Sequence, residues 1–283
     1  MTSSALNIVT FLLTTLLYYL TIKPVITYDI LVDPEKHKNF ISNGYTNLGI
    51  YVLLIIVSQY LVNVSIITTT CGGSITENLG AAAFLTFIPW SLMFGVLIIV
   101  LTMYPGFKTA FSDVIGYFYV SSSANKVLTD LLVDRDLQDT MDKDTTSTPE
   151  QKKSQQDTAD AIIKICGNTS ILINQIVPDN FVEYWNILNP LMKQEFQNNS
   201  TESQEKKMEL FELVVTRDNV GEAMWFIYTG ILVTSLVQLK IATRGCVSSP
   251  ATMSKNYQQF LDNQEQADAK QQQATSTVYT LAA

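Results

Sequence analysis

The chain has 283 residues, of which 16% are charged and 47% are hydrophobic, at a mean hydropathy of +0.16. Soluble domains average about 25% charged residues, so this composition argues against a soluble enzyme and against a secreted module held by disulfides. The net charge of −8 argues against nucleic-acid binding, because phosphate recognition needs clustered Lys and Arg.

Charged residues are missing from long parts of the N-terminal third. No Asp, Glu, Lys or Arg occurs before Lys23, between Lys38 and Glu77, or between Glu77 and Lys108. A bilayer core about 30 Å thick needs roughly 20 apolar residues in a helix. We therefore expect an all-α, multi-span membrane protein with a membrane domain over residues 1–104. The expected spans are residues 5–22, 46–67, 79–104 and 223–243.

Several side chains inside the expected spans carry further predictions. Pro89 is expected to kink the third span, and Trp90 to pack against other helices near mid-membrane. Four polar side chains are expected to hydrogen-bond between helices rather than form a transport site: Asn7, Gln59, Asn63 and Gln238. The first span could alternatively be a signal peptide, although no basic residue precedes it and no Ala-x-Ala-like site follows it.

Four spans place both termini on one side of the membrane and the loops 23–43 and 105–222 on the other. The loop side has more basic residues close to the spans, so the positive-inside rule favours a cytosolic large loop. On that side the glycosylation sequons at Asn168, Asn198 and Asn199 would stay unused.

Residues 105–222 are the stretch long enough for an extramembrane domain, with 11 Lys and Arg against 19 Asp and Glu. This acidic domain is expected to be a small helical bundle resting on the membrane between spans three and four. It opens with apolar side chains at helical spacing, namely Phe107, Phe111, Val114, Ile115 and Phe118. That spacing favours an amphipathic helix at the lipid interface over a buried core helix.

The rest of the polar sequence suggests caps, a linker and a tail. The serines Ser121–Ser123 are expected to cap the next helix. Residues 142–156 contain no apolar side chain apart from a proline, which predicts an exposed linker. Residues 244–283 form a polar, Gln-rich tail that is expected to be disordered on its own.

Catalytic chemistry is not predicted. The single histidine, His37, lies beside two lysines, which is typical of an ordinary loop residue. We find no Gly-rich phosphate loop, nucleophile elbow or zinc spacing, so we expect no catalytic, cofactor or metal residues. The spans contain no charged side chain, which argues against a proton relay or ion pathway.

The chain has three cysteines, Cys71, Cys166 and Cys246. Cys71 and Cys246 both lie just beyond a span on the terminus side, so a disulfide between them is feasible. Matching depth does not establish proximity, and we favour three unpaired thiols.

The sequence around the end of the third span is similar to one protein family. Residues 94–118 combine a hydrophobic span, a Pro-Gly-aromatic turn and a Phe-Ser-x-x-x-Gly-Tyr element. This pattern resembles membrane-spanning minor capsid proteins of large icosahedral DNA viruses of the chlorovirus type. The residues at the matching positions are Pro105, Gly106, Phe107, Phe111, Ser112, Gly116 and Tyr117.

The resemblance implies a function and a location. It implies a structural minor capsid protein that tethers an internal viral membrane, derived from the host endoplasmic reticulum, to the capsid shell. The seven matching residues would be interface candidates, and the partners would be the lipid bilayer and capsid or other minor capsid proteins. No nucleic acid, small-molecule substrate or enzymatic activity is expected. The alternative is a subunit of a membrane transporter or channel.

Overall fold

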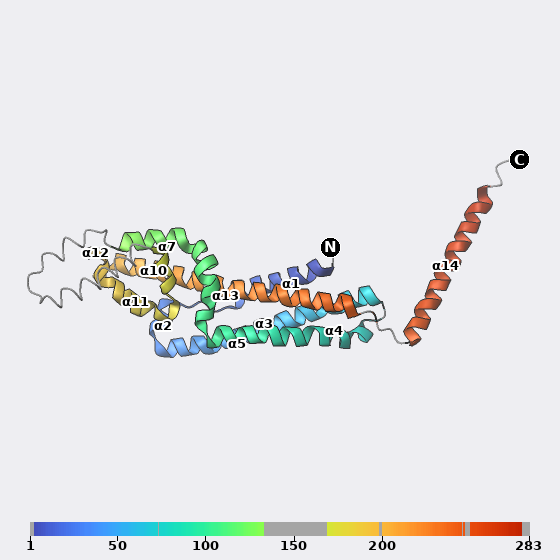
Figure 1. Cartoon of the computed structure of the whole chain (residues 1–283), viewed down its shortest axis with the longest axis horizontal. Coiled ribbons are helices and arrows are strands. Elements are labelled where there is room, and N and C mark those ends of the chain that lie inside the picture. Colours follow the sequence, from blue (N-terminus) through green and yellow to red (C-terminus); the bar gives the residue numbers. More distant parts are fainter. Residues whose placement is uncertain are drawn as a thin grey trace, which may run out of the picture.

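The computed structural model describes residues 3–72, 74–132, 169–197, 200–244, 246 and 250–278. Within these ranges the regular structure is helical, and no strand is present (Figure 1). The predicted all-α fold is therefore confirmed. The predicted linker 142–156, Cys166 and the sequons at Asn168, Asn198 and Asn199 lie outside the described residues.

Four helical segments are long and apolar enough to cross a membrane, as predicted. They lie side by side along the long axis of the molecule (Figure 1). The first consists of α1 (Ser3–Leu17) and a π-helical turn (Tyr18–Ile22), the second is α3 (Pro34–Cys71), the third runs from α4 (Ile75–Pro89) through a π-helical turn (Trp90–Phe94) to α5 (Gly95–Met103), and the fourth belongs to α13 (Thr201–Arg244).

Two of these helices are longer than the predicted spans. Helix α3 begins at Pro34, and the Asp33 side chain accepts hydrogen bonds from the backbone N–H groups of Glu35 and Lys36 at 3.0 and 3.1 Å. This cap starts the helix well before the apolar part of its sequence. His37 therefore lies in α3 and not in a loop, contrary to the prediction.

The predicted interhelical hydrogen bonds are confirmed. Asn7 donates from Nδ2 to Oδ1 of Asn63 at 2.9 Å, and Asn63 donates from Nδ2 to Oγ1 of Thr86 at 2.8 Å. Gln59 donates to the carbonyl oxygen of Asn7 at 3.0 Å, and Gln238 donates to Oδ1 of Asn63 at 3.4 Å. These residues come from α1, α3, α4 and α13, so one polar cluster joins all four spans.

Aromatic side chains fill the bundle on the domain side of this cluster. Trp90 is 1% exposed and packs between Phe11 and Phe94, each with ring centroids 5.5 Å away. The prediction that Trp90 packs inside the bundle is confirmed. Pro89 is the last residue of α4 and is followed directly by the π-helical turn, so the helix changes type at the proline.

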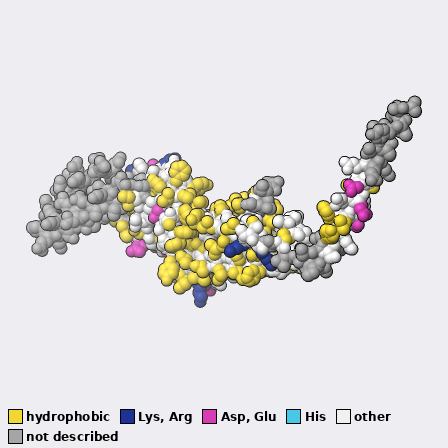
Figure 2. Space-filling view, turned by 45° about the vertical axis from the view of Figure 1, so that its right-hand side comes forward, with side chains coloured by type: hydrophobic (Ala, Val, Ile, Leu, Met, Phe, Trp, Pro, Cys, Tyr) yellow, Lys and Arg dark blue, Asp and Glu magenta, His cyan; other side chains and the backbone are white. Residues whose placement is uncertain are grey.

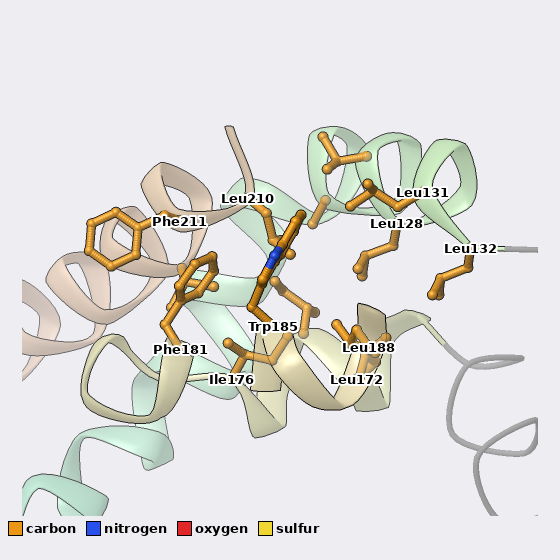
Figure 3. Packing of buried hydrophobic residues seen from close by; sticks show 14 of the residues in the cluster. Leu128, Leu131, Leu132, Leu172, Ile176, Phe181, Trp185, Leu188, Leu210 and Phe211 are labelled. Carbon is orange, nitrogen blue, oxygen red and sulfur yellow. The ribbon is translucent and has the colours of Figure 1, made fainter. Parts of the chain in front are cut away.

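The extramembrane domain has its own hydrophobic core (Figure 3). The core lies between the N-terminal half of α13 and α7 (Tyr117–Leu131), α10 (Thr169–Gln175), α11 (Phe181–Leu188) and α12 (Gln194–Gln197). A short helix from the first loop, α2 (Tyr28–Val32), also joins it, since the Tyr28 ring packs edge-on against Phe181 and Phe211. Helix α7 runs through Ser121–Ser123 without a break, so the predicted cap at these serines is wrong.

The two ends of the chain lie on the same side of the bundle (Figure 1). The tail that was expected to be disordered contains α14 (Pro250–Val278), which projects away from the bundle. Gln, Ala, Lys and Glu are good helix formers, which explains how a tail of such low hydrophobicity forms a helix. Tyr257 and Phe260 on α14 are 64% and 62% exposed.

Candidate functional site

The seven residues singled out by the sequence lie where the spans meet the extramembrane domain. They belong to a 3-10 turn (Pro105–Lys108), α6 (Thr109–Phe111), a π-helical turn (Ser112–Gly116) and the first residue of α7. This segment, green in Figure 1 between α5 and α7, runs across the long axis of the bundle. We call residues 105–119 the crossing segment.

The crossing segment packs very closely on α13. A Cβ atom added at Gly116 would lie 2.5 Å from the carbonyl oxygen of Arg217, and one added at Gly221 would lie 2.6 Å from Cβ of Ser112. Ser112 is 1% exposed. Small residues on both sides therefore let the two backbones approach. The contacts of Ser112 and Gly116 are with α13 of the same chain.

Aromatic contacts extend this packing toward the membrane. The Phe107 ring stacks on Trp225 with centroids 4.5 Å apart, and Nε1 of Trp225 donates to the carbonyl oxygen of Phe107 at 3.0 Å. Phe111 meets Trp225 edge-on at 4.8 Å. Trp and Tyr are common at this level of membrane proteins, because their rings combine an apolar body with a polar group. This arrangement attaches the crossing segment to the start of the fourth span.

The outer face of the crossing segment is apolar and exposed. Val114, Phe118 and Tyr119 are 66%, 82% and 72% exposed. Figure 2 shows hydrophobic side chains gathered over the middle of the molecule, with Lys and Arg side chains at the edges of this patch. An apolar outer face with a small-residue inner face fits an interfacial helix, which is the interpretation that the spacing favoured.

Charged residues link three chain segments beside the crossing segment. Glu222 of α13 forms ion pairs with Lys23, which follows the first span, and with Lys108 at 3.2 Å. Lys108 also pairs with Asp218 at 3.0 Å, and Tyr19 donates to Glu222 at 3.1 Å. Burial lowers the pKa of Lys108, but the carboxylates of Glu222 and Asp218 outweigh it and hold that pKa above its usual value of 10.5.

One arginine connects the crossing segment to the domain core. Arg217 is 0% exposed and donates to the backbone carbonyl oxygens of Ile173 and Ile176, at the end of α10. It also donates to Oδ1 of Asn174 at 3.2 Å and lies 3.9 Å from Oδ1 of Asp113. Burial raises the pKa of Asp113, although Arg217 opposes this. A cation is favourable at the carboxyl end of a helix, so Arg217 caps α10.

The predicted residues therefore divide into four groups. Pro105 and Gly106 are exposed in the turn, Phe107 and Phe111 contact Trp225, and Ser112 and Gly116 are buried against α13. Tyr117 packs against the domain core. Sequence reasoning missed the ion pairs of Glu222. The sequence contained a signal for them. Each of Lys23, Lys108 and Glu222 is the first charged residue beside a charge-free span, so the three residues must lie at a similar depth relative to the membrane.

At the opposite end of the bundle, Cys71 and Cys246 form a disulfide with Cα atoms 5.1 Å apart. The preference for unpaired thiols at these two positions was wrong. Helices α3 and α13 both pack on α1 and α4, and this packing brings the ends of the second and fourth spans together, which depth alone could not establish.

Comparison with known families, characterised proteins and solved structures finds no match for this chain. The geometry of the junction and the resemblance of residues 94–118 are therefore the features that bear on function.

Proposed function

We propose that the protein is a structural membrane anchor that holds a bilayer against a protein layer. In the setting that the resemblance implies, it is a minor capsid protein that tethers an internal viral membrane to the capsid shell. The main support for the proposal is that one helix, α13, belongs to both the membrane bundle and the extramembrane domain. This helix of 44 residues contributes its N-terminal half to the domain core and its C-terminal half to the bundle. At 1.5 Å per residue it is about 66 Å long, which is about twice the hydrocarbon thickness.

The contacts around α13 support a rigid connection. The ion pairs of Glu222, the close contact at Gly116 and the cap formed by Arg217 all join α13 to other segments within a few turns. A force on the domain would therefore reach the spans through a continuous helix rather than a flexible linker.

The interior of the bundle supports an anchor more than a transporter. Phe11, Trp90 and Phe94 fill its centre, and the amide cluster at Asn63 uses its polar groups to join helices. A transport site would need polar groups directed at a pathway. The transporter alternative is tested by reconstitution, where ion flux through vesicles containing the purified protein would favour it.

Detergent fractionation of isolated particles tests the anchor. If the domain binds a shell, the protein stays with the shell after a mild detergent removes the lipid, and it leaves with the lipid if the proposal is wrong. The variant Asn219→Pro interrupts α13 at the junction, since proline costs about 3 kcal/mol inside a helix. Thr201→Pro is the matched control, because proline is tolerated at the first position of a helix. We expect Asn219→Pro alone to loosen the attachment of membrane to shell.

A further inference from the structure

A cavity of about 300 Å³ lies at the junction, beside the ion pairs of Glu222. Its walls come from α3, from the end of α5 and from the segment after the first span. The lining residues on α3 are His37, Phe40, Ile41, Gly44, Tyr45 and Leu48. This volume is at the small end of ligand cavities, so it suits a headgroup and leaves no room for two acyl chains.

Opposite charges line the polar part of this cavity. Lys23 and Lys108 both line it, as do Glu222 and Asp179. Each lysine ammonium has three N–H donors, and Lys108 uses two of them, on Asp218 and Glu222. Lys23 directs one donor at Glu222. Both ammonium groups thus have donors left for a phosphate, while the exposed carboxylate of Asp179 can face a cation.

Apolar, exposed side chains lie at the cavity on two helices. Ile41 and Tyr45, which line it on α3, are 40% and 55% exposed. Thr102 lines it on α5, where the neighbouring side chains of Ile99 and Met103 are 56% and 65% exposed. Apolar side chains that are this exposed on a membrane span are in contact with lipid acyl chains. A molecule in the cavity can therefore extend directly into the bilayer.

We propose that this cavity binds the headgroup of one zwitterionic glycerophospholipid. Its phosphate accepts hydrogen bonds from Lys23 and Lys108, its amine faces Asp179, and its acyl chains lie along the exposed surfaces of α3 and α5. The lining comes from the spans, from the loop residues beside them and from Asp179 of the extramembrane domain, and lipid binding there does not require a shell.

Two glycines on α3 allow a matched test. A Cβ added at Gly44 or at Gly49 meets no atom within 4 Å, but only Gly44 lines the cavity. Gly44→Phe should therefore fill the site, while Gly49→Phe adds the same side chain outside it. The full chain, purified in a mild detergent and mixed with phosphatidylethanolamine, is measured by native mass spectrometry. We expect one retained lipid for the wild type and Gly49→Phe, and at least tenfold less for Gly44→Phe. Equal retention by the two variants overturns the proposal.

A second measurement uses a surface residue that leaves the fold intact. Asp179→Asn should reduce the preference for phosphatidylethanolamine over phosphatidic acid by about two- to fivefold, the range expected of an exposed ion pair. An unchanged preference contradicts the placement of the amine. Soluble glycerophosphoethanolamine should raise the melting temperature less than the intact lipid does. Equal stabilisation would contradict the placement of the acyl chains.

Discussion

Replacing Gly116 with alanine tests the close packing between the crossing segment and α13. The added Cβ would lie 2.5 Å from the backbone oxygen of Arg217 and 3.0 Å from its Cγ. A backbone oxygen cannot rotate away as a flexible side chain can, so the helices must separate. Separation would also weaken the bonds that Arg217 makes to the end of α10.

The expected magnitude follows from two opposing effects. Forcing an extra methyl group into a packed contact costs about 1–3 kcal/mol. Alanine has a better helix propensity than glycine, by about 1 kcal/mol. The free energy of unfolding should therefore fall by up to about 2 kcal/mol in Gly116→Ala. In Gly95→Ala, where the Cβ meets nothing within 4 Å, the free energy of unfolding should stay unchanged or rise.

Denaturant unfolding in detergent micelles, followed by tryptophan fluorescence, measures both variants. A second variant at the same contact, Gly221→Ala, should also destabilise, because its Cβ would lie 2.6 Å from Cβ of Ser112. Once one substitution has separated the helices, the other costs less. The loss of stability in the double variant should therefore be smaller than the sum of the losses in the two single variants. If Gly116→Ala is as stable as Gly95→Ala, the packing argument for the crossing segment is refuted.

Three further predictions concern the spans and the ion pairs. Asn63→Leu removes hydrogen bonds to three other helices, so the free energy of unfolding in micelles should fall by about 1–2 kcal/mol, at roughly 0.6 kcal/mol per bond. Val96→Arg places a charge on a lipid-facing position of α5 and should disfavour insertion by about 2.5–3.5 kcal/mol, seen as loss of carbonate-resistant membrane association. The pKa of Lys108 is raised in the folded state, so its charge stabilises the fold fully below pH 10.5 and the contribution disappears as pH rises through the higher value. When the pH is raised from 7 to a strongly alkaline value, the melting temperature of Lys108→Met should fall less than that of the wild type. An equal fall in the two proteins would contradict the role of the ion pairs.

Charge and hydropathy alone were enough to predict the spans and their polar contacts. Charge-free runs identify lipid-facing helices because the penalty for a charge in hydrocarbon is large and independent of tertiary structure. The interhelical roles of Asn7 and Asn63 followed from the same reasoning, since a polar group in lipid must find a partner. The polar extension of α3 was missed because hydropathy does not report helices outside the membrane. Its signal was the Asp33-Pro34 pair, which caps the helix.

The domain was harder to predict, because its contacts depend on tertiary packing. Serine can either cap a helix or lie within one, and the choice at Ser121–Ser123 follows from the core that α7 buries on both sides of them. The burial of Arg217 depends on where the end of α10 comes to lie, which no local pattern contains. For the same reason, depth along the spans placed Cys71 and Cys246 at one level but could not give their lateral distance.

The disulfide and the distribution of basic residues together predict how the protein crosses the membrane. Disulfides persist in oxidising compartments, which assigns the end of the bundle carrying Cys71 and Cys246 to a lumenal or external side. Lys23 and Lys108 flank the spans at the other end, which is the arrangement expected on a cytosolic side. Because covalent chemistry and charge agree, the extramembrane domain should face the cytosol and its sequons at Asn168, Asn198 and Asn199 should carry no glycan. Glycosidase treatment of the protein expressed in eukaryotic cells should leave its mass unchanged, whereas a mass loss traced to one of these sequons would reverse the assigned orientation.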